Sequence, residues 1–187
     1  MPQYPNARSG ATMSLLTVPI GKNAPREVHT IIEIPKGSSN KYEFDLGLNT
    51  FVLDRVLFSP LYYPFDYGFV AGTLSGDGDP LDVLVLGSQP TFTGCVVLAR
   101  PLGSLHMRDE EGEDFKILAV SARDPRFNDY NDLSDIAEHY LREITHFFAV
   151  YKELEEKETE VLGWQDRSTA YGIISEARRR MSGSVTP

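Results

Sequence analysis

The sequence predicts an α+β protein that is mainly β, with short strands followed by two helices. Turn-forming residues recur about every ten positions up to about residue 120, and the segments between them are rich in β-branched and aromatic side chains. Beyond about residue 130, apolar residues recur at steps of three and four, as in amphipathic helices. Closely spaced strands joined by short turns pair antiparallel, so the first part is expected to form a barrel or a sandwich.

Six segments carry the strand pattern, and one of them also gathers charges. The candidate strands are Val28 to Ile34, Lys41 to Asp45, Phe51 to Leu57, Leu81 to Leu86, Cys95 to Pro101 and Phe115 to Val120. In the second of these, Tyr42 and Phe44 alternate with charged residues. Because successive side chains of a strand point to opposite faces, Lys41, Glu43 and Asp45 are expected on one face.

Two helices are predicted in the last third of the chain. The first, expected to be the longest, runs from Asp132 to Glu155, with Asn131 or Asp132 as its N-cap. Its apolar stripe comprises Leu133, Ile136, Ala137, Tyr140, Ile144, Phe147, Phe148, Tyr151 and Leu154. The second is expected from Asp166 to Met181. Cations suit the C-terminal end of a helix, so Arg178-Arg179-Arg180 is interpreted as a solvated helix end rather than a site.

Length and composition predict one domain in a reducing compartment. With 187 residues, of which 41% are hydrophobic, the chain is expected to form a single domain over residues 13–181. Residues 1–12 and 182–187 are interpreted as a flexible arm and a flexible tail. The single cysteine, Cys95, lies in an apolar run and is interpreted as a core residue without a disulfide.

Charge and hydropathy narrow the class of partner. The formal net charge is −9, whereas proteins that bind nucleic-acid backbones rely on clustered Lys and Arg, so nucleic acid is not expected as a partner. No apolar run approaches the length of a membrane span, and the amino-terminal residues lack the apolar centre of a signal peptide. A cytoplasmic protein with no membrane partner is therefore expected.

The densest chemical signal is the run Gly76-Asp77-Gly78-Asp79-Pro80-Leu81-Asp82, which places three carboxylates just before an apolar strand. The glycines permit tight turning, so the carboxylates can converge on a hard cation. An isolated Asp-Gly-Asp is more often an ordinary acidic turn. A calcium EF-hand loop beginning at Asp77 would need Gly and Glu where this chain has Asp82 and Ser88, so that interpretation fails.

Other charged groups favour a metal and phosphate site over an acidic turn. A second acidic run, Asp109-Glu110-Glu111-Gly112-Glu113-Asp114-Phe115-Lys116, precedes another strand, and Asp114 and Lys116 are expected on the same face. Cations and phenols stand among these acids at Lys41, Arg55, Tyr63, Tyr67, Tyr151 and Lys152. Clustered carboxylates repel one another unless a cation neutralises them, and Mg²⁺ binds through a few carboxylates together with substrate phosphate.

These residues resemble the soluble inorganic pyrophosphatases of the first family, in their short prokaryotic form. The matching segments, which fall between Ser14 and Ala177, are Glu33-Ile34-Pro35-Lys36-Gly37-Ser38-Ser39-Asn40-Lys41-Tyr42-Glu43, Asp54-Arg55, Tyr63-Pro64-Phe65-Asp66-Tyr67-Gly68, Asp77 to Asp82, Asp109 to Lys116, and His146-Phe147-Phe148-Ala149-Val150-Tyr151-Lys152. The resemblance implies a five-stranded barrel of the oligonucleotide-binding (OB) type with C-terminal helices packed against it. It also implies Mg²⁺-dependent hydrolysis of pyrophosphate to two orthophosphates by direct attack of a metal-activated water.

The resemblance implies a role for each matching residue. Asp79 would accept a proton from the attacking water. The metal ligands would be Asp77, Asp82, Asp109, Asp114, Glu33 and Glu43, with Glu110 a weaker candidate. The phosphate binders would be Lys41, Arg55, Tyr67, Lys116, Tyr151 and Lys152, supported by Tyr63. On its own residues the chain favours Tyr151 as a core residue, because it continues an apolar stripe, and the resemblance reverses that interpretation. None of His29, His106, His139 and His146 has the spacing of a metal ligand.

The same resemblance implies several Mg²⁺ ions per site with Mn²⁺ as a substitute, a homohexamer, and a part in phosphate metabolism. Two alternatives remain. Barrels of this type also bind single-stranded nucleic acid on basic, aromatic surfaces, which the acidic balance of this chain disfavours. The second alternative keeps the fold but takes a nucleotide or a longer polyphosphate, because the same metals and cations would serve any phosphoanhydride.

Overall fold

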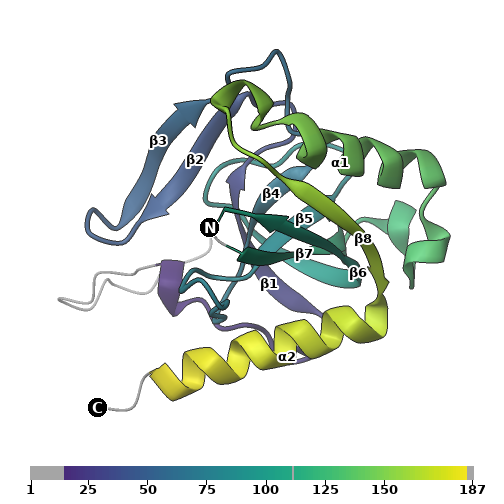
Figure 1. The fold of residues 1–187 in the computed structure, drawn as a ribbon. Helices are drawn as coiled ribbons and strands as arrows, with labels where there is room; N and C mark the ends of the chain where they lie inside the picture. The colour runs from purple at the N-terminus through teal and green to yellow at the C-terminus, as the bar shows by residue number, and fades with distance from the viewer. Residues whose placement is uncertain (1–14, 111, 185–187) are drawn as a thin grey trace, which may run out of the picture.

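The computed structural model describes residues 15–110 and 112–184, in which five strands close into a ring (Figure 1). The ring consists, in spatial order, of β1 (Val28–Ile34), β4 (Asp66–Val70), β5 (Asp82–Leu86), β7 (Gly112–Ser121) and β6 (Val96–Asp109). It closes because β6 pairs with β1 as well as with β7. Neighbouring strands are antiparallel except β5 and β7, which are parallel. The expected mainly-β fold with a five-stranded OB-type barrel is confirmed.

Two further sheet elements extend this barrel. The strand β8 (Glu160–Asp166) pairs with residues 103–108 of β6. The strands β2 (Asn40–Asp45) and β3 (Thr50–Val56) form a separate hairpin that projects from the barrel (Figure 1). The sequence pattern predicts neither β4 nor β8. It also ends β6 at Pro101, whereas the strand continues because its pairing with β7 is irregular there, and a missing N–H is tolerated at a bulge.

The expected helix from Asp132 to Glu155 is broken into three pieces. These are the 3₁₀ helix η3 (Leu133–Asp135), the α-helix α1 (Glu138–Val150) and the 3₁₀ helix η4 (Glu153–Glu155). Asp132 forms a capping box with Asp135 and therefore caps η3, whereas the N-cap of α1 is Ala137. The first break falls at Ile136 and Ala137, whose ψ angles of 130° and 128° are not helical.

The expectation that this helix is the longest is wrong. The second helix, α2 (Arg167–Ser184), has 18 residues and α1 has 13. Residues 182–184 of the expected tail are thus helical, while residues 185–187 and the expected arm, 1–12, lie outside the described residues. Short 3₁₀ helices also occur as η1 (Leu15–Thr17) and η2 (Pro125–Phe127).

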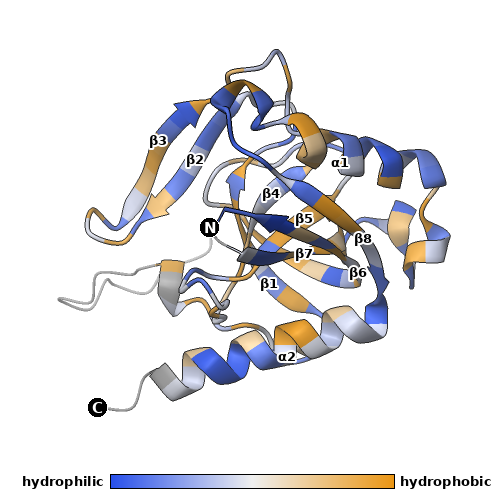
Figure 2. Ribbon diagram, in the orientation of Figure 1, coloured by the Kyte–Doolittle hydropathy of each residue, from blue (hydrophilic) through white to orange (hydrophobic). Residues whose placement is uncertain are grey.

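The two α-helices cover different parts of the barrel. The side chains of Ile144, Phe147 and Phe148 on α1 pack into one buried cluster with barrel residues, and Ala170 and Ile174 on α2 pack into another. Figure 2 shows hydrophobic stretches on the barrel strands and in the middle of α2. Cys95 is partly buried against the second cluster. No helix in the described part of the chain is long and apolar enough to cross a membrane.

Candidate active site

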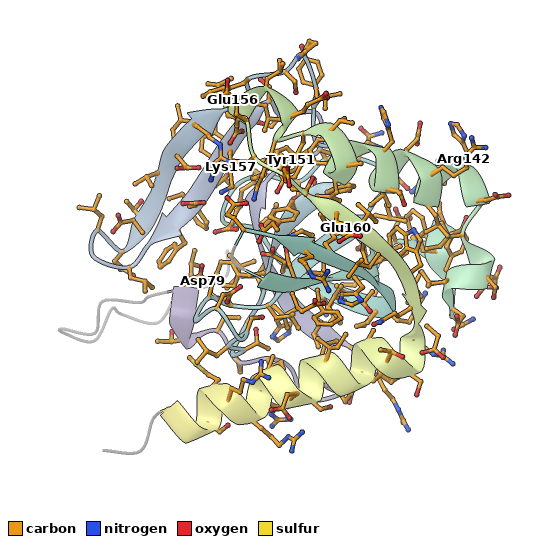
Figure 3. All side chains as sticks on the ribbon, in the orientation of Figure 1. Asp79, Arg142, Tyr151, Glu156, Lys157 and Glu160 are labelled. Carbon is orange, nitrogen blue, oxygen red and sulfur yellow. The ribbon has the colours of Figure 1, made fainter. Side chains whose placement is uncertain are left out.

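A cavity of about 570 Å³ is bounded by the β2–β3 hairpin, the barrel and the C-terminal end of α1. It brings together every residue singled out above as a proton acceptor, metal ligand or phosphate binder, along with the supporting candidates. These residues are Glu33, Lys41, Glu43, Arg55, Tyr63, Tyr67, Asp77, Asp79, Asp82, Asp109, Glu110, Asp114, Lys116, Tyr151 and Lys152. Figure 3 labels two of them, Asp79 on the loop before β5 and Tyr151 at the end of α1.

A tight loop presents Asp79 to the cavity. Its backbone N–H donates to the Asp77 carboxylate at 2.9 Å, and its carbonyl accepts from the Ser75 N–H at 2.6 Å. Gly78 sits between them at φ +98°, a conformation that L side chains rarely adopt. Partial burial and the neighbouring charges of Asp77 and Asp82 raise the pKa of Asp79. The loop thus holds a carboxylate that is more basic than a free aspartate.

The centre of the site is a buried lysine on β7. The Lys116 ammonium, whose residue is 3% exposed, lies 2.6 Å from Asp82 Oδ2, 2.8 Å from Asp114 Oδ2 and 3.1 Å from Tyr67 Oη. Burial acts to lower the pKa of Lys116, but Asp82, Tyr67 and Asp114 outweigh it, so the pKa stays above its ordinary value and the group stays charged. The expectation that Asp114 and Lys116 share a face is confirmed.

Two further carboxylates of the cavity, those of Glu33 and Asp114, have raised pKa values. Burial, followed by the charge of Asp82, raises the pKa of Glu33 to about 8, although its Oε1 accepts the Phe44 N–H at 3.0 Å. Burial likewise raises the pKa of Asp114 despite the nearby Lys116. The charge of Asp82 disfavours the ionisation of both Glu33 and Asp114, so the cavity has an excess of negative charge for a cation to neutralise.

The remaining cations each pair with an acid. Lys152 Nζ lies 3.0 Å from Asp109 Oδ2, and Lys41 Nζ pairs with Glu43. Arg55 Nε donates to Glu155 Oε1 at 3.0 Å. All three cations also line the cavity, where the oxygens of a polyanion could replace part of these contacts.

In the arrangement described for residues 15–110 and 112–184, no group of three or more His, Cys, Asp or Glu side chains is gathered tightly enough to hold a metal ion. The ion pairs explain this, since Asp82 and Asp114 turn toward Lys116 and Asp109 turns toward Lys152. The donor chemistry nevertheless fits a hard divalent cation. The described lining offers many carboxylates and no His or Cys, and oxygen ligands are what Mg²⁺ prefers.

Two polar residues of this region, Glu155 and Lys157, were missed by the sequence analysis, which quoted Asp54 in a matching segment but gave it no role. Asp54 and Lys157 line the cavity, and Glu155 lies behind Arg55. Lys157 Nζ pairs with Glu110 Oε1 at 2.8 Å, next to the Lys152–Asp109 pair. Glu155 and Lys157 belong to a mixed charge run of the kind that is usually exposed to solvent, and no spacing rule distinguishes them.

The histidines lie elsewhere in the structure. His29 Nδ1 is 2.8 Å from the Pro19 carbonyl, and the His106 ring stacks on Phe115 at a centroid distance of 4.4 Å. None of the four is among the described residues that line the cavity. Any metal in this cavity would therefore be bound by oxygen ligands.

Fold and site together define an OB-type barrel protein whose acidic, lysine-containing cavity has the chemistry to bind divalent cations and phosphate groups. Residues 30–182 match the family model described as inorganic pyrophosphatase. The chain belongs to the inorganic pyrophosphatase family, which confirms the resemblance drawn from its motifs.

Relatives match the chain over most of their length. The inorganic pyrophosphatase of Halalkalibacterium halodurans is 52% identical over 159 residues, which is 85% of this chain and 98% of that protein. The inorganic pyrophosphatase of Synechocystis sp. is 52% identical over 149 residues, or 80% and 88% of the two chains. The crystal structure of inorganic pyrophosphatase from Thermus thermophilus aligns with a TM-score of 0.89 at 44% identity, covering 91% of this chain and 100% of that one.

Proposed function

We propose that the chain hydrolyses inorganic pyrophosphate to two orthophosphates in a reaction that requires Mg²⁺, with Mn²⁺ as a substitute. The observation that carries this proposal is the convergence of crowded carboxylates and buried or half-buried cations on one cavity. A substrate of high negative charge complements the cations, and divalent metals complement the carboxylates. Relatives named inorganic pyrophosphatase, matched over most of their length, support the same substrate.

The cations and phenols would bind and orient the phosphate oxygens. The residues in this role are Lys41, Arg55, Tyr67, Lys116, Tyr151 and Lys152. Arg55 offers a planar fork of donors, whereas Lys116 acts as a point charge of fixed position. If Asp82 and Asp114 bound metal ions, they would no longer pair with Lys116. The Lys116 ammonium would then be available to phosphate oxygens. Metal binding and substrate binding would therefore favour each other.

The carboxylates would divide into ligands and a proton acceptor. The ligands would be Asp77, Asp82, Asp109, Asp114, Glu33 and Glu43, in part through water. Bound Mg²⁺ would acidify the attacking water and offset the charge of both phosphoryl groups. Asp79 would accept a proton from that water, a role that its raised pKa supports. Water would attack one phosphorus directly, without a covalent enzyme intermediate, and the bond from that phosphorus to the bridging oxygen would break as the second orthophosphate leaves.

The proposal also covers location and assembly. We infer a cytoplasmic homohexamer, in keeping with the family resemblance. Large apolar side chains that are more than half exposed support association, among them Phe58 (63%) and Phe92 (67%). Sedimentation analysis at micromolar concentration tests the state of assembly, and a monomer would remove this part of the proposal.

The proposed function is tested by phosphate release from pyrophosphate, with ATP in parallel and with or without Mg²⁺. Fast release from pyrophosphate in the presence of Mg²⁺ is expected, with much slower release from ATP. Asp79→Ala should lower kcat at least about a hundredfold, because general bases contribute on this scale. Asp129→Ala is the matched control, since Asp129 is exposed and outside the cavity. Absence of phosphate release by the wild type would refute the proposal. Equally fast release from ATP would show that the substrates include other phosphoanhydrides.

A further inference from the structure

Two carboxylates hold the guanidinium of Arg55, which lies on β3 of the hairpin and lines the cavity. Its Nε donates to Glu155 Oε1 at 3.0 Å, and its Nη1 lies 2.5 Å from Asp54 Oδ2. Nη2 has no hydrogen-bond partner among the described residues. The two carboxylates thus fix the plane of the guanidinium and leave one edge of it for another acceptor.

The two carboxylates differ in whether they can fix the position of the Arg55 guanidinium relative to the cavity. Asp54 precedes Arg55 on the same strand, so it moves with the hairpin. Glu155 belongs to η4, 100 residues further along the chain, in the turn that follows Tyr151 and Lys152. Only a contact between the hairpin and the body of the protein can set where the Arg55 guanidinium lies relative to the rest of the cavity. Among the described residues, Glu155 makes that contact with the guanidinium.

Glu155 is poorly suited to touch substrate itself. Its side chain is 7% exposed, and it is not among the described residues that line the cavity. A carboxylate is rarely buried to this degree unless it is paired. Its role is therefore to be sought in its partner, Arg55.

We propose that Glu155 is a positioning residue for pyrophosphate hydrolysis, holding Arg55 so that its free guanidinium edge faces the substrate phosphate. This inference rests on the proposed function. Orienting a flexible arginine before the substrate arrives removes an ordering cost from binding, and misplacement of a binding group by about 1 Å can strongly reduce rate. Glu155 also ties the hairpin to the turn that carries Lys152, so two phosphate binders share one support.

The test is a double-mutant cycle between Glu155 and Arg55, read as kcat/KM for pyrophosphate at saturating Mg²⁺. Glu155→Ala in the wild-type background should lower kcat/KM about tenfold, because Arg55 is present but no longer oriented. In an Arg55→Ala background the same change should have almost no further effect. Equal losses in both backgrounds would show that Glu155 acts independently of Arg55 and would overturn the inference.

Conservative variants and a matched control separate positioning from structural support. Glu155→Gln retains an oxygen that accepts from Nε and should keep most of the activity, whereas Glu155→Asp is one methylene shorter and should behave like Glu155→Ala. Glu153→Ala is the control, because Glu153 is an exposed acid on the same 3₁₀ helix. If Glu155→Ala matches Glu153→Ala, Glu155 has no positioning role.

A binding measurement keeps this inference distinct from the proposed function. Orthophosphate affinity measured by calorimetry should follow the same pattern, with Glu155→Ala about tenfold weaker and no further loss beside Arg55→Ala. A wild type that fails to hydrolyse pyrophosphate would refute the proposed function, while the calorimetric cycle would still decide whether Glu155 orients Arg55 for a phosphate oxygen. Additive affinity losses in that cycle would overturn the positioning role on their own.

Discussion

At the scale of single residues, Lys116 decides the charge balance of the cavity. Its ammonium is almost fully buried and pairs with two carboxylates, Asp82 and Asp114, that come from neighbouring parallel strands. A buried charge is stable only when it is paired and hydrogen-bonded, and Tyr67 supplies the third polar contact. The same group that would bind phosphate therefore also keeps the metal-free cavity folded.

Lys116→Met should destabilise the metal-free protein by about 3 kcal/mol, because it keeps the side-chain volume but leaves two carboxylates without their cation. The free energy of unfolding in urea with EDTA measures this effect. Lys157→Met provides the comparison, since Lys157 and its partner Glu110 are 48% and 40% exposed and such pairs contribute at most about 1 kcal/mol. Similar losses for the two variants would contradict the central role of Lys116.

The same scale shows which site residues a sequence can reveal. Asp77, Asp79 and Asp82 are recognisable because a single Gly-Asp-Gly-Asp-Pro run presents them together. Glu155 stands in the run Glu153-Leu154-Glu155-Glu156, which reads as a solvated face. Its burial follows from contact with Arg55 100 residues away, and such a contact leaves no local pattern.

At the scale of elements, the sequence pattern fails to predict the strands β4 and β8 because of full burial in one and a glycine in each. β4 is buried along all five residues, so it lacks the alternation of a half-buried strand, and Gly68 stands at its centre. β8 contains Gly163, which has φ +131°, and Gly lowers strand propensity. The sequence spacing of apolar residues continues from Leu133 to Leu154 across both breaks in the helix, because 3₁₀ turns have a similar period, so it hides the breaks. The predicted stripe is only partly buried, since Tyr140 and Leu154 are more than half exposed.

The glycines offer a test of how closely the barrel strands pack. A Cβ at Gly68 would lie 1.9 Å from the Ile31 carbonyl oxygen and 2.9 Å from Ile32 Cα, both in the backbone of β1. Gly68→Ala should therefore cost roughly 3 kcal/mol or more, since the neighbouring strand must shift. Gly172→Ala in α2 meets nothing within 4 Å and should instead stabilise the protein by about 0.5–1 kcal/mol. Thermal denaturation of both variants measures these effects, and a neutral Gly68→Ala would show that the two strands are not in such tight contact.

At the scale of the whole molecule, barrel closure creates the site. Periodicity alone leaves barrel and sandwich equally open, because the pairing of β1 with β6 joins segments more than sixty residues apart, from Val28 with Ala99 to Ile31 with Val96. The motif resemblance resolves that choice. Closure then carries Glu33 from β1, Asp82 from β5 and Asp114 from β7 to one cavity, in a chain whose net charge is already −9.

This concentration of acids predicts an unusual dependence of stability on pH. The pKa of Glu33 rises from 4.5 to about 8 through burial and the charge of Asp82, with Glu43 adding to the rise and Lys41 and the Phe44 N–H opposing it. The folded chain therefore holds a proton that the unfolded chain has lost between about pH 4.5 and 8. Stability contributed by this group is fully present below pH 4.5 and is lost as the pH rises toward 8. The raised pKa values of Asp79 and Asp114 act in the same direction.

Between pH 5 and 8, the metal-free protein should lose roughly 2–4 kcal/mol of unfolding free energy, since one pKa unit corresponds to about 1.4 kcal/mol. Acids with lowered pKa values, such as Asp124 at about 2, do not titrate in this window and leave the slope unchanged. Glu33→Gln should flatten most of the profile, because an amide cannot ionise.

Excess Mg²⁺ should raise the midpoint of thermal unfolding more at pH 8 than at pH 5, since cations bind the ionised carboxylates and thus the folded chain. Urea denaturation in EDTA at each pH measures the first effect, and thermal denaturation with EDTA or Mg²⁺ at pH 5 and pH 8 measures the second. An unchanged pH slope in Glu33→Gln would show that another group titrates in this window. A gain from Mg²⁺ that is equal at both pH values would show that the metal does not bind these carboxylates.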